Sequence, residues 1–159
     1  MRINSATLAL VVSLSSSVVA LAREPEWRIY SNPAGTSVAI PAGIFTSPIS
    51  RLEAGTGDKF STADGRAMLS IYVLPANGQS PETYLRAHMT NRSGDLDYRR
   101  VTKHFFAVSK YARDNVLYRR CNFSNGKIHC IDLAYPRREE KAWDRIVTRI
   151  SLSLRPLRG

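Results

Sequence analysis

The segment VLYRRCNFS-NG-KIHCIDLAY, residues 116–135, decides the fold. Residues 116–124 and 127–135 have the composition of strands, and Asn125-Gly126 stands between them. An Asn-Gly pair is the strongest short-range signal for a two-residue hairpin turn, because both central residues of a type I′ turn need a positive φ. The segment therefore predicts an antiparallel hairpin in which the numbers of facing residues add up to 251.

That register places Cys121 and Cys130, the only cysteines of the chain, directly opposite each other. The position is a non-hydrogen-bonded pair, where the Cα atoms come close enough for a disulfide. A C-x-x-C motif is absent from the sequence, and two cysteines alone cannot fill a tetrahedral zinc site. We therefore expect a structural disulfide, with a redox or metal site as the minor alternative. The same register predicts a cross-strand ion pair between Arg119 and Asp132.

Shorter patterns on either side of the hairpin predict further strands and two helices. Asp64-Gly65 marks a second hairpin turn, and Ser80-Pro81 and Pro136 mark the approach to each helix. The expected strands are 27–30, 36–40, 58–62, 66–74, 98–102 and 104–109. The first expected helix begins at Ser80-Pro81, and the second covers residues 139–152. In the first helix, Tyr84, Leu85, His88 and Met89 are expected to form the apolar face.

This order of elements predicts an α+β fold. Strands joined by short turns favour an antiparallel sheet, here of about six or seven strands, with two amphipathic helices packed against it. The sequence shows no internal repeat and no long linker, so we expect residues 23–159 to form a single domain and a monomer.

Residues 1–22 have the pattern of a secretory signal peptide. Arg2 supplies the positive region, residues 8–19 are largely apolar, and Ala20-Leu21-Ala22 is a typical cleavage site. Serines interrupt the apolar run, which is shorter than the ~20 apolar residues that span a bilayer. We therefore expect cleavage near Ala22 and a periplasmic or secreted protein, in a compartment that favours disulfides.

Positive charge is concentrated in the second half of the chain. Residues 23–94 contain 7 Lys and Arg against 6 Asp and Glu, whereas residues 95–159 contain 15 against 7. This imbalance suits either a solvated basic surface or a site for an anionic lipid or polysaccharide of the cell envelope. No nucleic-acid motif is present, and we expect no nucleic-acid partner. The candidate anion-binding residues are Arg99, Arg100, Lys103, Arg119, Arg120, Arg137 and Arg138.

The sequence contains no pattern typical of an enzyme. The three histidines, His88, His104 and His129, lack metal-ligand spacing, and no G-x-S-x-G motif is present. We expect a binding or accessory module without catalytic activity, metal or cofactor, whose partner is another protein or an anionic component of the cell envelope. The alternative is a hydrolase with an unrecognised site, which predicts a deep pocket that holds a histidine beside a carboxylate or a serine.

Several motifs resemble those of small exported alphaproteobacterial proteins of the rhizobial kind, a group without an established activity. The matching residues are Trp27-Arg28-Ile29-Tyr30-Ser31-Asn32, Gly35, Pro41, Gly57-Asp58, Phe60, Asp64-Gly65-Arg66-Ala67, Tyr84, Tyr135-Pro136 and the region from Trp143 to Pro156. The order of elements also resembles the Mog1/PsbP-like sandwich. Because PsbP-like domains are accessory binding proteins, this resemblance implies a non-enzymatic role and supplies no catalytic residue.

Overall fold

The computed structural model describes residues 25–47, 49–52, 57–89 and 96–157. The predicted leader, residues 1–22, lies outside these ranges. Within them, no helix is long and apolar enough to cross a membrane.

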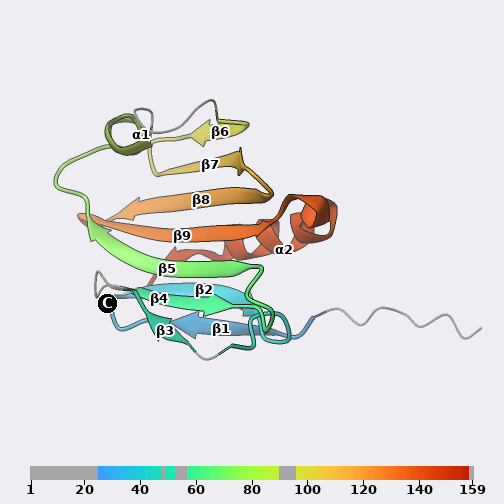
Figure 1. Ribbon diagram of the computed structural model, residues 1–159. Helices are drawn as coiled ribbons and strands as arrows, with labels where there is room; N and C mark the ends of the chain where they lie inside the picture. Colours follow the sequence, from blue (N-terminus) through green and yellow to red (C-terminus); the bar gives the residue numbers. More distant parts are fainter. Residues whose placement is uncertain (1–24, 48, 53–56, 90–95, 158–159) are drawn as a thin grey trace, which may run out of the picture.

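A seven-stranded antiparallel sheet forms the centre of the molecule (Figure 1). Its strand order is β3-β4-β5-β9-β8-β7-β6, so the hairpin predicted around the cysteines lies among the inner strands. This arrangement confirms the predicted α+β class and the expected number of strands. The strands are β3 (Ser50–Arg51), β4 (Gly57–Ser61), β5 (Met68–Pro75), β6 (Tyr98–Val101), β7 (Phe105–Ala112), β8 (Asn115–Ser124) and β9 (Lys127–Pro136).

The hairpin of β8 and β9 has the predicted register. Ser124 pairs with Lys127, and Cys121 pairs with Cys130. Asn125 and Gly126 have φ angles of 49° and 72°, the left-handed conformation that a type I′ turn needs. The prediction was possible because a two-residue turn fixes every facing pair of the two strands.

Strands β1 (Trp27–Ser31) and β2 (Thr36–Pro41) form a separate antiparallel sheet. Its third strand is β10 (Arg155–Pro156), and the order is β1-β2-β10. The sequence patterns predicted β1 and β2 but not this second sheet. A strand of two residues shows no periodicity, so β10 leaves no signal of its own in the sequence.

Helix α2 (Glu140–Ser153), preceded by the 3₁₀ turn Arg137–Glu139, covers one face of the large sheet together with the small sheet (Figure 1). We call this the α2-side face. The main core lies between these layers, and its residues come from β2, β4, β5, β8, β9 and α2. Trp143, Val147 and Ile150 are buried, as the helical spacing predicts.

Helix α1 (Pro81–Met89) packs on the opposite face, which we call the α1-side face, where a smaller core includes Leu85 and the two cysteines. Ser80 caps the helix, because its Oγ accepts a hydrogen bond from the Thr83 amide at 3.2 Å. The prediction that His88 belongs to the apolar face is wrong. His88 is exposed and stacks on Tyr84 at 4.1 Å, since the short helix turns only one side to the sheet.

Candidate functional site

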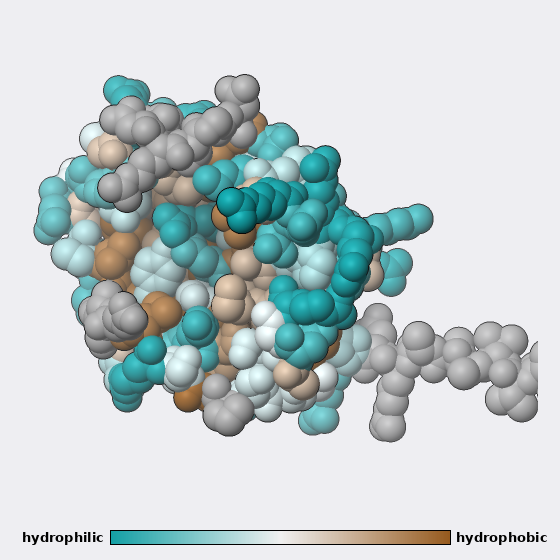
Figure 2. Space-filling view, in the orientation of Figure 1, coloured by the Kyte–Doolittle hydropathy of each residue, from teal (hydrophilic) through white to brown (hydrophobic). Residues whose placement is uncertain are grey.

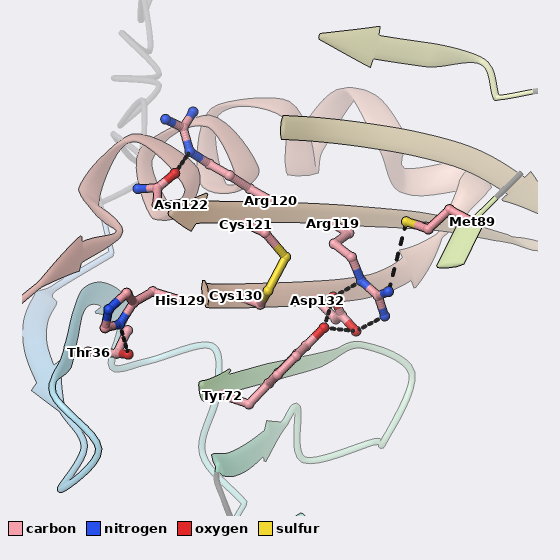
Figure 3. The surroundings of a disulfide bond; sticks show 10 residues. All are labelled: Thr36, Tyr72, Met89, Arg119, Arg120, Cys121, Asn122, His129, Cys130 and Asp132. Atoms are coloured by element: carbon pink, nitrogen blue, oxygen red, sulfur yellow. Dashed lines mark hydrogen bonds and ion pairs between the residues drawn. A yellow bond between two sulfur atoms is a disulfide. The ribbon is translucent and has the colours of Figure 1, made fainter. Parts of the chain in front are cut away.

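The disulfide lies on the α1-side face, in the centre of the large sheet (Figure 3). Its sulfur atoms are 2.05 Å apart, and the Cα atoms of Cys121 and Cys130 are separated by 4.2 Å. Both cysteines are fully buried. The disulfide joins β8 to β9 at a point where α1 covers the sheet. It therefore holds these two strands together next to the candidate site.

The predicted ion pair between Arg119 and Asp132 is present on the same two strands, two residues away from the disulfide. The guanidinium donates two hydrogen bonds to the carboxylate, at 2.6 and 2.5 Å. The Tyr72 hydroxyl donates to both oxygens of Asp132, at 3.1 and 3.2 Å (Figure 3). Burial and the negative charge of Asp132 raise the pKa of Tyr72, so its hydroxyl stays neutral and can donate.

A pocket of about 390 Å³ opens beside this ion pair. We call it the sheet-face pocket. Apolar side chains from α1 and four strands line it, and Lys59, Lys110 and Arg119 supply three positive charges against the single negative charge of Asp132. In Figure 2, which shows this side of the molecule, brown apolar residues lie among teal hydrophilic ones. The apolar lining residues include Met68, Met89, Leu96, Val108 and Leu117.

The pocket exists because α1 covers only part of the sheet. The helix has 9 residues and packs against β7 and β8, whereas β5 and β9 continue beyond it. Met68 on β5 is 39% exposed as a result. A basic rim around an apolar floor can hold a molecule that has an apolar part and one negatively charged group.

The seven candidate anion-binding residues do not form one surface. Alternate residues of a strand point to opposite faces, so each arginine pair within a strand is divided. Arg99 and Arg119 lie on the α1-side face, where they pair with Glu82 and Asp132. Arg100 and Arg120 lie on the α2-side face, and Lys103 lies in the turn between β6 and β7. Whether these residues bind anions stays a prediction.

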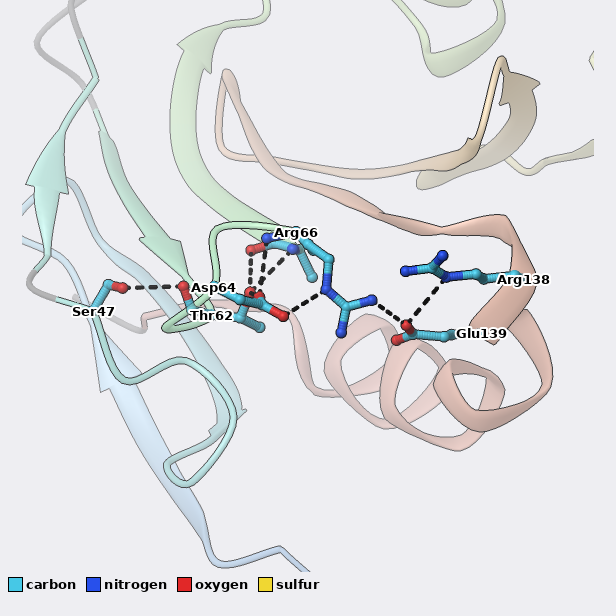
Figure 4. A network of polar contacts seen from close by, with 7 residues as sticks. Ser47, Thr62, Asp64, Arg66, Arg138 and Glu139 are labelled. Atoms are coloured by element: carbon cyan, nitrogen blue, oxygen red, sulfur yellow. Dashed lines mark hydrogen bonds and ion pairs between the residues drawn. The ribbon is translucent and has the colours of Figure 1, made fainter.

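Arg137 and Arg138 occupy a third location, at one end of the large sheet. With Arg66 and Arg113 they line a cavity of about 810 Å³. Arg66 already binds Asp64 and Glu139, and Arg138 lies 3.8 Å from Glu139 (Figure 4). The sequence analysis missed Arg66 and Arg113. Arg66 lies in the turn before β5 and Arg113 in the turn between β7 and β8, and only the folded sheet brings these two turns to the start of α2.

The three histidines lie apart from one another. His129 is buried and faces away from the disulfide, and its Nδ1 lies 2.8 Å from the Thr36 hydroxyl (Figure 3). His104 is exposed in a turn, and the Nδ1 of His88 lies 2.9 Å from the Tyr84 carbonyl oxygen. Among the described residues, no group of three or more His, Cys, Asp and Glu side chains could hold a metal ion.

Solved structures with this architecture include one from a cyanobacterium and one from a yeast. The cyanobacterial PsbP protein, CyanoP, of Synechocystis sp. PCC 6803 matches with a TM-score of 0.59 and 13% identity, over 89% of this chain and 97% of that one. The chain has the Mog1/PsbP-like fold. The Ran-binding protein Mog1p of Saccharomyces cerevisiae matches with a TM-score of 0.57 and 9% identity, over 84% of this chain and 97% of Mog1p.

No protein-family model matches the chain, and no curated protein matches its sequence. The identities to CyanoP and Mog1p are so low that the two similarities show the fold alone. They confirm the Mog1/PsbP-like architecture that the order of elements predicted. The resemblance to exported alphaproteobacterial proteins stays an expectation.

Proposed function

We propose that the protein is an exported binding module without catalytic activity. Its ligand is an anionic component of the cell envelope that has an apolar part, and the sheet-face pocket holds it. The observation that carries this proposal is the pocket itself, because it combines an apolar lining with three positive charges and one negative charge. In a pocket of this kind, apolar contacts supply affinity and a few charged groups fix the orientation of the ligand.

The charges around the pocket suit an anion because its one acid is already neutralised. Both oxygens of Asp132 accept hydrogen bonds from Arg119 and from Tyr72. Lys59 also lines the pocket and adds a positive charge that Asp132 does not offset. Met68, Met89 and Leu117 supply the apolar contacts.

Two further observations support a binding role in an exported protein. The Cys121–Cys130 disulfide suits an oxidising compartment, such as the periplasm or the medium. Mog1p, whose fold is similar, is a Ran-binding protein, so at least one protein with this architecture acts by binding another molecule. We propose the same general role here, with a different ligand.

A fluorescent amphipathic anion tests the proposal. The probe 1-anilinonaphthalene-8-sulfonate has apolar rings and one sulfonate, and its fluorescence rises when the rings leave water. We expect saturable binding to the folded protein. The substitution Met68→Glu places a carboxylate at the edge of the pocket and should weaken binding by about tenfold or more, since an anion then faces a like charge across apolar surface.

The matched control is Ile29→Glu, which adds the same charge to the small sheet at a side chain that is 72% exposed. It should leave binding of the probe unchanged. Thermal unfolding of both variants shows that they are folded. Equal binding by the Met68→Glu variant and the parent protein would contradict the proposal, and so would equal loss in the two variants.

A further inference from the structure

A second hollow lies on the α2-side face, away from the sheet-face pocket. Two consecutive rows across β6, β7 and β8 have the same pattern of a large, a small and a large side chain. The rows are Tyr98-Ser109-Tyr118 and Arg100-Ala107-Arg120. Both small side chains lie on β7, so the rows leave a trough along this strand. We call it the β7 trough, and its cavity measures about 470 Å³.

Two guanidinium groups converge at one end of the β7 trough. The Cζ atoms of Arg100 and Arg120 lie 5.6 and 4.0 Å from the centre of the Phe105 ring, which places them at most 9.6 Å apart. Ala107 lies between the two arginines and is too small to fill the space above the strand. One tetrahedral oxyanion can bridge such a gap, with hydrogen bonds of about 2.7–2.9 Å to each guanidinium.

These two arginines lack the carboxylate partners that the arginines of the other face have. Within the described ranges, neither Arg100 nor Arg120 lies within ion-pair distance of an Asp or Glu, whereas Arg99 and Arg119 are both paired. The Nε of Arg120 donates to the neutral Asn122 amide oxygen at 3.0 Å. Burial lowers the pKa of Arg120, and the neighbouring positive charge of Arg100 lowers it as well.

The other end of the trough is acidic. Glu140 and Asp144 of α2 line it, and the Tyr111 hydroxyl donates to Glu140 at 3.1 Å. An anionic group is therefore favoured only near Arg100 and Arg120. The aromatic side chains Tyr98 and Phe105 leave apolar surface for the uncharged part of a ligand.

We propose that the β7 trough binds a phosphomonoester, with the phosphoryl group between Arg100 and Arg120 above Ala107. A phosphomonoester carries a charge of about −1.5 to −2 at neutral pH, which matches two guanidinium groups, whereas a carboxylate balances only one. The planar guanidinium also matches the geometry of phosphate oxygens. This site lies on the opposite face from the sheet-face pocket and does not depend on the function proposed for that pocket.

Titration calorimetry at constant ionic strength tests the proposal with two sources of the same group. Glycerol 3-phosphate represents a free phosphomonoester, and vesicles that contain phosphatidic acid represent a lipid headgroup. Vesicles of phosphatidylglycerol, a phosphodiester, measure general attraction to an anionic surface. Arg100→Gln and Arg120→Gln should each weaken binding by about tenfold or more, since each removes a charge-assisted hydrogen bond.

Two more variants separate the site from general charge and from folding defects. Arg145→Gln removes an exposed arginine of α2 outside the trough and should bind normally. Ala107→Val keeps every charge and suits a strand, but it fills the floor, so it should lose binding. Thermal unfolding confirms that each variant is folded.

The proposal is supported with a soluble ligand if the Arg100, Arg120 and Ala107 variants lose binding of glycerol 3-phosphate and Arg145→Gln keeps it. The same pattern with phosphatidic acid vesicles alone supports it with a lipid headgroup. The proposal is overturned if neither ligand binds, if phosphatidylglycerol vesicles bind equally well, or if Arg145→Gln and Ala107→Val behave alike.

Discussion

Arg119 and Arg120 are neighbours in β8, but their side chains meet different surroundings. Arg119 binds Asp132 beside the sheet-face pocket, and Arg120 stacks on Phe105 in the β7 trough. The alternation of side chains along a strand is the cause. Cys121 follows the same alternation and lies on the face of Arg119. A shift of one residue along β8 therefore moves a side chain to the other face of the sheet, where its contacts are different.

The disulfide gives a prediction about stability at the residue scale. Replacing both Cys121 and Cys130 by Ala should lower the free energy of unfolding by about 2.5–3 kcal/mol, because a short closed loop restricts the unfolded chain. Urea denaturation of the parent protein and of the double variant measures the difference. A reductant should destabilise the parent and leave the variant unchanged. Equal midpoints for the oxidised parent and the variant would show that the bond adds no stability.

Contacts between elements hold the two sheets together. His129 on β9 and Thr36 on β2 meet at 2.8 Å in the interior, so one buried polar contact links the large sheet to the small one. Tyr30 on β1 donates a hydrogen bond to Asp58 on β4 and makes a second link between the sheets. Burial and the negative charge of Asp58 raise the pKa of Tyr30, so this hydroxyl also stays neutral.

The link through His129 predicts a pH dependence of stability. Burial and the charge of Lys127 lower the pKa of His129 below its ordinary value of about 6.5. The unfolded chain therefore binds a proton more readily than the folded one. The contribution of His129 is complete above pH ~6.5 and is lost as the pH falls through the lower pKa of the folded state.

Urea denaturation between pH 7 and pH 5 measures this dependence. His129→Gln should flatten the profile in this range, whereas His104→Gln, at an exposed turn, should keep the slope of the parent protein. An unchanged slope in the His129→Gln variant would show that another group causes the dependence.

Local patterns predicted most of the elements, and the sites depend on contacts that local patterns do not show. The Asn125-Gly126 turn was enough to predict the disulfide and the Arg119–Asp132 pair, because a short turn fixes the register. The sheet-face pocket joins Lys59, Met89 and Asp132 from three elements that are far apart in the sequence. The β7 trough depends on the pairing of β6 and β8 with β7, which no turn residue specified. The small sheet depends on the pairing of β10 with β2, two strands that lie at opposite ends of the domain in the sequence.

At the scale of the whole molecule, the large sheet separates two candidate binding regions. The α1-side face holds the sheet-face pocket and the disulfide, and the α2-side face holds the β7 trough. Neither region is fully covered, because α1 and α2 each pack on only part of a sheet of seven strands. Two different ligands could therefore bind to the same domain without competing for one pocket.

The central claim is that this domain works outside the cytoplasm in a disulfide-bonded form. The most direct test is the intact mass of the full chain, produced in a bacterium with its own leader and recovered from the periplasmic fraction, before and after reduction and alkylation. We expect a protein that begins at Arg23, resists alkylation as isolated and takes up two alkyl groups after reduction. A product that keeps residues 1–22, or has two thiols that react before reduction, would contradict the claim.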